Sequence, residues 1–349
     1  MTATRPLALA GAVSALSIAV TAAAAFATFG AAEPGAWRAA LTALAAALPV
    51  LALFTLRPLA VGVGSARRSS HFSGVGDLPE ARKFRHRARH AAWVVMGSCL
   101  PLLLASAFVL FLLANDHAVQ RTFFNGEFVS RSAGDVTRAF GQNLFIAVAA
   151  EGLVLVWGLV VAIARLAPGP AGRPLRWLAT AYVDTFRAIP SIIVIYLVGF
   201  GLPLAEVPLL SDLSPTWAAV LALTLTYGAY VAEVYRAGIE SIHWSQVSAA
   251  RSLGLSYGKT MRFVVVPQAL RRVTPPLLND FIGLQKDTAL VTVIGTVDAF
   301  TQAKTYASNY FNLSSVTVVA VLFVLITIPQ TRFVDRLLER DAKRLRSVS

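Results

Sequence analysis

The chain has 349 residues, of which 56% are hydrophobic and only 14% carry a charge. Soluble globular proteins contain about 45–50% apolar and about 25% charged residues, so the composition excludes an ordinary soluble domain and predicts an all-α polytopic membrane protein. The net charge of +13 comes from basic residues that gather between apolar runs. This distribution is typical of cytoplasmic loops, and no stacking aromatic residues are interleaved with the basic ones, so nucleic acid is not an expected partner.

Eight apolar segments are long enough to cross a bilayer as helices, for which about 20 residues are needed. They span residues 7–30, 38–56, 91–114, 142–165, 180–204, 216–237, 276–296 and 313–331. The first segment is longer than the roughly 7–15 apolar residues of a signal peptide, so we expect a retained span; cleavage would move only the N-terminus to the outside. The segment 276–296 contains Asn279, Asp280, Lys286 and Asp287, and we expect it to be kinked or partly re-entrant.

The loops between these segments alternate in charge, and this alternation predicts the topology. Basic residues concentrate in 57–90, in 166–179 and in the C-terminal tail, whereas 205–215 contains Glu206 and Asp212 and no basic residue. Because basic loops stay in the cytoplasm, we expect both termini to be cytoplasmic.

The chain divides into parts of different character. Residues 1–114 form an N-terminal extension of three predicted spans with a basic cytoplasmic loop, and residues 115–141 form an external linker. Residues 142–337 contain five predicted spans with polar residues in and between them, and residues 338–349 form a basic cytoplasmic tail. The chemistry of the chain is expected in 142–337.

The cytoplasmic stretch GLSYGKT, residues 254–260, looks at first like a phosphate-binding loop. Such a loop has four residues before its Gly-Lys pair and follows a buried strand; here three residues intervene and an alanine-rich helical stretch precedes, so we expect no nucleotide on this chain. The pattern instead predicts two short helices, one from the N-cap Ser245 to Gly254 and one from Ser256 to Pro267. Either the first helix docks into a groove of another protein through a small apolar face formed by Ala249, Ala250 and Leu253, or the segment is an ordinary loop on the bilayer.

The residues around Gly254 resemble the permease subunits of ABC-type importers, whose cytoplasmic pattern is E-A-A-x3-G-x9-I-x-L-P. The matching positions are Ser248, Ala249, Ala250, Gly254, Val264, Val266 and Pro267. Three flanking segments, YVDTFRAIPSIIVIYLVGFGLP (182–203), AYVAEVYRAGIESI (229–242) and PQALRRVTPPLLNDFIGLQKDTALVTVIG (267–295), resemble the subfamily that imports histidine, glutamine, glutamate and similar polar amino acids. The resemblance covers about residues 140–340.

This resemblance implies a type I ABC importer core of five helices in the bacterial cytoplasmic membrane, with 238–267 as the loop that couples it to an ATPase. The expected coupling residues are Gln246, Ser248, Ala249, Ala250, Gly254 and Pro267. It also implies an amino-acid substrate and several partners: an ATPase dimer that carries ATP and Mg, a second permease subunit, an external solute-binding protein and membrane lipid. The chain itself is then a transport subunit that binds no cofactor, not an enzyme.

Three features depart from the family pattern. Ser248 stands where the pattern has glutamate, so docking on the ATPase would depend more on shape than on charge. Valines occupy the positions of isoleucine and leucine before Pro267, and the three N-terminal spans lie outside the pattern. The basic segment EARKFRHRARH, residues 80–90, could lie on anionic lipid or contact the ATPase, and the sequence leaves both open.

A candidate substrate path is formed by polar residues at membrane depth: Glu151, Asn279, Lys286, Asp287 and Thr288. Charges inside a bilayer are costly and usually face a protein interior or a water-filled path. Glu151 or Asp287 could meet a substrate ammonium, and Lys286 a substrate carboxylate. Alternatively Glu151 makes a contact between helices or subunits, and Lys286 and Asp287 neutralise each other.

A second polar group is expected at the inner membrane surface: Tyr182, Asp184, Arg187, Pro190, Glu233 and Arg236. Pro190 should kink or begin a membrane helix. Arg187 can reach the inner headgroups, with Tyr182 and Asp184 in a structural role. Glu233 and Arg236 are predicted to form an ion-pair network, with gating as a second role.

Other functions fit the sequence less well. The same kind of permease could carry another small solute, such as an opine or cystine. An ion-coupled secondary transporter often shows inverted repeats, and none is visible here. The histidines lie in loops or at span edges and form no catalytic or metal-binding set, so we expect no metal site: His71, His86, His90, His117 and His243.

Overall fold

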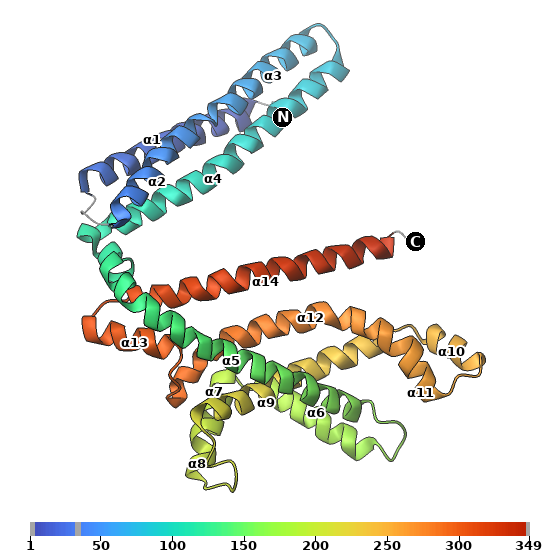
Figure 1. Cartoon of the computed structure of the whole chain (residues 1–349). Helices are drawn as coiled ribbons and strands as arrows, with labels where there is room; N and C mark the ends of the chain where they lie inside the picture. The colour runs from blue at the N-terminus through green and yellow to red at the C-terminus, as the bar shows by residue number, and fades with distance from the viewer. Residues whose placement is uncertain (1–3, 32–35, 347–349) are drawn as a thin grey trace. The chain divides into compact units, whose positions relative to one another are not determined.

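The computed structural model describes residues 4–31 and 36–346, and within these ranges every regular element is helical (Figure 1). The predicted all-α class is therefore confirmed. The chain forms two compact units, Met1–Phe128 and Val129–Ser349. Each unit has hydrophobic cores of its own.

The N-terminal unit consists of α1 (Thr4–Ala31), α2 (Ala36–Leu53), α3 (Leu56–Gly74) and α4 (Leu78–Phe123). In Figure 1, α3 and α4 form an antiparallel hairpin, and α1 packs along α4. Small residues such as Ala10, Ala88 and Ala92 are fully buried between these helices, which allows the close approach that stabilises helix pairs in a membrane. The hydroxyls of Ser14 and Thr55 add one interhelical hydrogen bond of 2.7 Å.

The basic segment 57–90 is not a loop but a helical hairpin with a tight turn. Gly76 lies in this turn with φ +83°, a conformation that favours glycine. Asp77 caps α4 by accepting a 3.2 Å hydrogen bond from the N–H of Glu80. The predicted connection between the second and third spans is therefore itself helical, because arginine and lysine are good helix formers and α3 packs along α4.

The segment 115–141 is also largely helical. α4 continues to Phe123, and α5 (Gly126–Arg165) begins after only Phe124 and Asn125. The boundary between the two compact units, at Phe128 and Val129, falls within this segment.

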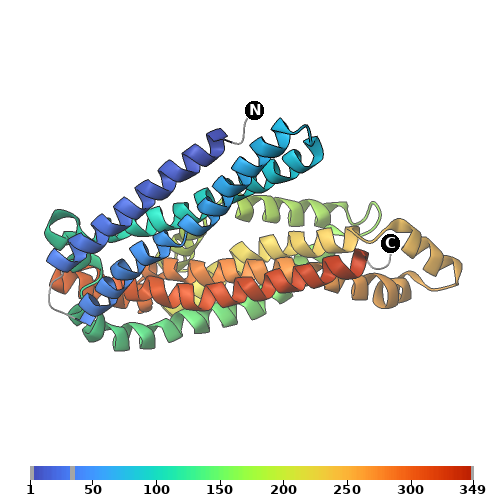
Figure 2. The ribbon, with the colours of Figure 1, turned by 90° about the horizontal axis from the view of Figure 1, so that it is seen from above.

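The second unit is centred on α9 (Pro215–Glu240), which packs against α6, α7 and α12 (Figure 2). Buried residues of α9 such as Leu223 and Val231 belong to its main hydrophobic core. The other elements, in chain order, are α6 (Arg173–Ala188), α7 (Ser191–Tyr196), the π-helical η1 (Leu197–Gly201), α8 (Leu202–Leu204), α10 (Trp244–Ser252), α11 (Tyr257–Thr260), the π-helical η2 (Met261–Val265), α12 (Val266–Asp287), the 3-10 helix η3 (Thr288–Ile294), α13 (Ala299–Tyr310) and α14 (Ser314–Arg346).

Six helices in the described ranges are long and apolar enough to cross a membrane, and one bent pair would make seven. The bent pair joins α6 to α7 and α8 through an angle of 104°. Ile189 is extended at the break and Pro190 caps α7, because a residue that precedes proline avoids the helical conformation. Pro190 therefore begins a helix, as predicted, and the predicted span 180–204 is broken at this residue.

The seventh predicted span, 276–296, is not a continuous α-helix and is not among these six or seven. α12 starts earlier, at Val266, and ends at Asp287, where the chain tightens into η3. Gly295, with φ +79°, ends η3. Irregular backbone at membrane depth is tolerated where protein surrounds it, and Thr288, Val291 and Ile294 of η3 are indeed buried.

Candidate functional site

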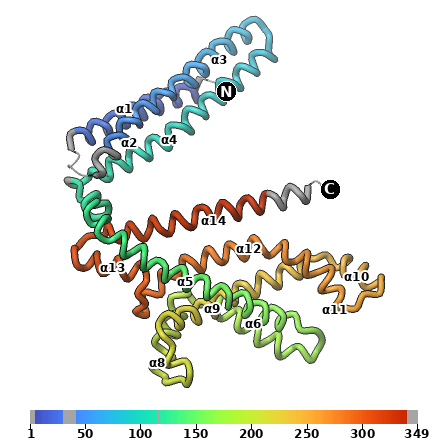
Figure 3. The backbone as a smooth tube through the Cα atoms, in the orientation of Figure 1, coloured from blue at the N-terminus to red at the C-terminus, as the bar shows by residue number. Residues whose placement is uncertain are grey.

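The candidate coupling segment comprises α10 and α11, at the end of the second unit opposite α13 (Figure 3). Gly254 follows α10 with φ +82°, a left-handed conformation that ends the helix. Ser256 caps α11 by accepting a 3.4 Å hydrogen bond from the N–H of Lys259. These two boundaries agree with the sequence. The predicted N-cap Ser245 is wrong: the N-cap is His243, two residues earlier, and its ring Nδ1 accepts from the N–H of Ser245 at 3.3 Å.

The second helix of the segment does not end at Pro267. α11 passes through η2 directly into α12, and Pro267 lies in the first turn of α12. The N–H of Val266 bonds to the carbonyl of Met261, five residues earlier, in the wider π-helical pattern of η2. Pro267 follows at the start of α12, where the absence of an N–H group is tolerated. The candidate coupling segment is thus continuous with α12.

The two sides of α10 differ in exposure. Val247 packs against a cluster of Ile242, Val265 and Ala269 at the start of α12, and Ala250 is buried as well. The opposite side exposes the predicted coupling residues Gln246, Ser248 and Ala249. The predicted single face of Ala249, Ala250 and Leu253 is therefore wrong: Ala250 points inward, while Leu253 is 84% exposed.

Large apolar side chains surround this exposed side. Trp244, Leu253 and Tyr257 are 71%, 84% and 62% exposed. The guanidinium of Arg251 donates to the carbonyl of Leu255 at 2.9 Å and braces the turn that carries Gly254. Apolar groups held outward on a braced turn are typical of a protein contact surface.

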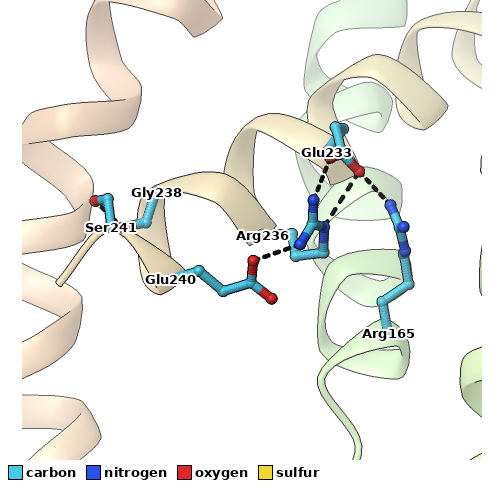
Figure 4. A network of polar contacts seen from close by, with 6 residues as sticks. All are labelled: Arg165, Glu233, Arg236, Gly238, Glu240 and Ser241. Atoms are coloured by element: carbon cyan, nitrogen blue, oxygen red, sulfur yellow. Dashed lines mark hydrogen bonds and ion pairs between the residues drawn. The ribbon is translucent and has the colours of Figure 1, made fainter. Parts of the chain in front are cut away.

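The inner-surface ion pairs predicted for Glu233 and Arg236 are present and extend further (Figure 4). Glu233 accepts hydrogen bonds from both Arg165 and Arg236, and Arg236 also pairs with Glu240. Arg165 ends α5, so the network ties α5 to the last turns of α9. Beside it, the hydroxyl of Ser241 donates to the carbonyl of Gly238 at 2.7 Å.

The other residues predicted at the inner surface make contacts within the chain or are exposed. The hydroxyl of Tyr182 accepts from Trp157 Nε1 at 2.8 Å and donates to the carbonyl of Leu225 at 2.6 Å, which links α5, α6 and α9. Arg187 lies over the ring of Tyr230 at 5.5 Å. Asp184 is exposed.

The polar residues of α12 fall on different faces. Asn279 and Lys286 are exposed in this chain, whereas Asp287 is half-buried and accepts a 3.0 Å hydrogen bond from the hydroxyl of Tyr227. Among the described residues no ion pair joins Lys286 to Asp287. The neutralising contact considered from the sequence is therefore not formed.

Glu151 is half-buried on α5 beside an apolar hollow of about 320 Å³. The hollow is lined by Glu151, Leu155, Thr274, Leu277, Leu278 and Phe281. Asp280, on α12, is close enough to Glu151 for their charges to interact, and one of its carboxylate oxygens is buried without a hydrogen-bond partner. Two carboxylates on different helices, α5 and α12, are therefore close enough to repel each other.

Thr288 is in a different place from the rest of the candidate path. It is fully buried, and its hydroxyl donates to the carbonyl of Gln285 at 2.7 Å. The side-chain amide of Asn143 donates to Thr288 Oγ1 at 3.2 Å and to Asp298 at 3.1 Å, and its oxygen accepts from the N–H of Ala299 at 3.0 Å. This network fastens α5 to η3 and to the start of α13.

The family of the chain follows from comparison with known proteins. Residues 155–346 match the family described as "binding-protein-dependent transport system inner membrane component", which is more than half of the chain. The chain belongs to this family. The permease is therefore a multi-pass inner-membrane component of an ABC transporter, and the matched residues include α9, α10 and α12.

Curated relatives of this permease agree with the family. It is 34% identical over 202 residues to the arginine transport system permease protein ArtQ of Bacillus subtilis, covering 58% of this chain and 89% of that protein. It is 36% identical over 207 residues to the glutamine transport system permease protein GlnP of Escherichia coli K12, covering 58% and 90%. A crystal structure titled as an amino acid ABC transporter with histidines is similar with a TM-score of 0.56 at 27% identity, covering 62% of this chain and all of that one. The type I importer fold predicted for the core is confirmed.

Several polar residues of the permease escaped the sequence prediction. Asp280 was noted only as a polar residue of its span, and Tyr227 and Asn143 were not singled out. Asn143 lies at the predicted edge of a span, where polar residues are common and indicate no special role. Its partner Asp298 lies far away in the sequence. The only available signal was that each is a polar residue within or beside an apolar run.

In the ranges that the structure describes, His, Cys, Asp and Glu side chains form no group of three or more that could hold a metal ion.

Proposed function

We propose that this permease is the membrane subunit of an ATP-driven importer of a polar amino acid, and that a separate ATPase drives it through α10. The observation that carries the proposal is the exposed side of α10, held on a braced turn and continuous with α12, in a chain whose relatives are named for arginine and glutamine transport. ATP and Mg belong to the ATPase dimer, so this subunit does not hydrolyse ATP and binds no cofactor.

The packing supports a mechanical link between α10 and the membrane helices. Val247 and its buried neighbours fix α10 to α12, and Arg272 on α12 donates to the carbonyl of Ser241 at 2.5 Å, just before α10. A displacement of α10 by the ATPase would therefore move the ends of α9 and α12 together. The ion pairs of Glu233 with Arg165 and Arg236 would hold α5 to α9 during this movement.

The side chains at membrane depth support a path for a molecule with an ammonium group. Glu151 and Asp280 supply negative charge beside a hollow. Asp287 of α12 supplies a further carboxylate, which accepts a hydrogen bond from Tyr227 of α9. Lys286 and Asn279 are available to a substrate carboxylate or to the second permease subunit. Thr288 keeps a structural role, because its polar atoms are engaged with Asn143 and Gln285.

The proposal includes the assembly that such an importer requires: a second permease subunit, the ATPase dimer and an external solute-binding protein, in a bacterial cytoplasmic membrane with both chain termini in the cytoplasm. Reconstitution of the permease with these partners and a panel of amino acids, including cystine and an opine, tests the substrate class. Stimulated ATP hydrolysis with a polar amino acid supports the proposal, and stimulation by none of them contradicts it.

Gly254→Asp tests the coupling. The substitution places a charged side chain on a left-handed turn in the docking surface, so we expect ATP-coupled uptake to be abolished while the protein still reaches the membrane. Gly76→Asp is a matched control, because Gly76 also has φ +83° and open space around it but lies in the N-terminal hairpin. Normal uptake by Gly254→Asp, or equal loss in both variants, would remove α10 as the coupling element.

A further inference from the structure

The hairpin of α3 and α4 reaches beyond the membrane. α4 has 46 residues, about 69 Å at 1.5 Å per residue, whereas the hydrocarbon core of a bilayer is about 30 Å thick. Apart from His117 and Arg121 near its C-terminal end, its basic residues lie in the first turns, before the apolar run that begins at Ala91. Trp93, which is 69% exposed, marks the transition, since exposed tryptophans gather at the membrane–water boundary.

A hollow of about 440 Å³ opens between α3 and α4 at this transition. It is lined by Pro58, Val61, His86, Arg87, His90, Ala91 and Val94. Three of these side chains, His86, Arg87 and His90, form a basic half, and none of the lining residues is acidic. The other half is apolar, with Val61 and Val94 63% and 43% exposed. The hollow therefore combines a site for an anion with a site for hydrocarbon.

The basic half is held in place by aromatic stacking. The guanidinium of Arg87 lies 5.7 Å from the ring centre of Phe84, and Phe84 stacks on Phe72 of α3 at 5.5 Å. A guanidinium that rests on an aromatic face keeps its N–H groups free to bind a phosphate in a fixed geometry. The nearest acidic residue along α4, Glu80, is paired with Lys83 at 3.2 Å.

We propose that this hollow binds one anionic phospholipid of the inner leaflet. Arg87, His86 and His90 hold the phosphate of the headgroup, and the first part of an acyl chain lies over Val61 and Val94. The positive charge of the hairpin places it at the cytoplasmic leaflet. A protein partner fits less well, because the apolar half continues onto exposed residues of the membrane span, such as Leu100 and Leu104. The inference does not depend on the transported substrate.

The test uses the full-length permease in detergent, titrated by native mass spectrometry with phosphatidylglycerol and with phosphatidylcholine of the same acyl chains. The wild-type chain should prefer phosphatidylglycerol. Arg87→Gln removes a charge-assisted hydrogen bond, so we expect it to weaken phosphatidylglycerol binding about tenfold. Arg89→Gln is the matched control, because Arg89 is an exposed arginine of the same run that does not line the hollow, and it should weaken binding much less.

A second matched pair tests the apolar half. Val61→Ser should weaken binding of both lipids, whereas Val63→Ser should not, because Val63 is 39% exposed on α3 but lies outside the hollow. Circular dichroism must show wild-type helix content for every variant compared.

Three results would overturn the proposal. Equal weakening by Arg87→Gln and Arg89→Gln would indicate diffuse attraction to anionic lipid. Displacement of the lipid by inorganic phosphate or by the soluble headgroup glycerophosphoglycerol at equal concentration would indicate a site for a free anion. Unchanged lipid binding by Arg87→Gln, with loss of ATPase co-purification, would indicate a protein contact.

Discussion

Among the candidate membrane helices of the described ranges, α9 of the second unit is the most enclosed, whereas α14 of the same unit is as open as α4 of the N-terminal unit. In α9, 61% of the residues in its most apolar stretch are buried within the chain, against 22% in the corresponding stretch of α4. α9 is therefore enclosed by protein on most sides, whereas α4 packs along one face and leaves the rest to lipid or other partners. This difference indicates which unit has an interior that can contain a polar path.

The units also differ in the regularity of their backbone. The described spans of the N-terminal unit are α-helical apart from the short break between α2 and α3. The second unit contains two π-helical stretches, a 3-10 stretch and the bend at Pro190. Backbone groups freed by such irregularities must be satisfied within protein, and η2 and η3 here lie at the two ends of α12. The family match, which begins at Leu155, falls entirely in this irregular unit.

The largest expected effect concerns the buried network of the second unit. Asn143→Leu removes two donors and one acceptor from fully buried partners, so we expect the free energy of unfolding to fall by about 3 kcal/mol. The N-terminal unit offers a contrast in Ser14→Ala, which removes only the bond to Thr55 and should cost about 0.6 kcal/mol. Chemical unfolding of the purified permease in micelles measures both. An equal decrease in the free energy of unfolding for both variants would contradict the view that buried hydrogen bonds stabilise the second unit more than the N-terminal unit.

Much of the fold can be predicted from the sequence, because its dominant signal is the length of apolar runs. That signal locates most of the spans. Gly254 and Ser256 correctly mark the turn between α10 and α11, because glycine favours a positive φ and a serine hydroxyl can cap a helix. The bend at Ile189 follows from Pro190 alone, but its size does not, because the packing of α7 against α9 and η3 sets the angle.

The site is less predictable, because its residues are brought together by tertiary packing. Asp280 and Glu151 belong to different helices, and nothing local shows that they approach each other. The sequence predicts that a helix stops at Pro267, whereas α12 starts at Val266 with Pro267 in its first turn, where proline is tolerated. The ion pairs of Arg165 and Glu240 are likewise not predictable from the sequence. Each is a charged residue at a helix end, and the partner of Arg165 is known only once α5 and α9 lie side by side.

A smaller effect is expected where helices meet at glycine in each unit. A Cβ on Gly238 would lie 2.1 Å from Cγ1 of Val273, a stiff side chain on α12, so Gly238→Ala must separate two helices and should cost about 2 kcal/mol and impair uptake. A Cβ on Gly62 would meet the flexible end of Leu7 at 2.7 Å and Cβ of Ala91 at 3.1 Å, so α3 and α4 need to shift by only a few tenths of an ångström. Gly62→Ala should therefore cost less and leave uptake unchanged. Thermal unfolding and uptake assays measure these effects. Loss of uptake in Gly62→Ala would show that the N-terminal unit takes part in transport.

The smallest effect on stability is expected when an exposed lysine is replaced by alanine. A lysine of the second unit and one of the N-terminal unit should then differ only in their effect on uptake. Lys286→Ala removes an exposed side chain, so unfolding should not change, but if Lys286 meets a substrate carboxylate the half-saturation of uptake should rise about tenfold. Lys83→Ala breaks only the exposed pair with Glu80 and should change neither quantity.

Uptake measured over a range of substrate concentrations separates the roles open to Lys286. A contact with the second permease subunit would lower the amount of assembled transporter, and therefore the maximal rate, without changing half-saturation. A contact with substrate would change half-saturation at constant assembly. If Lys286→Ala changes neither, the negative residues Glu151 and Asp280 remain as the polar groups of the path, and recognition would rest on the ammonium of the substrate alone.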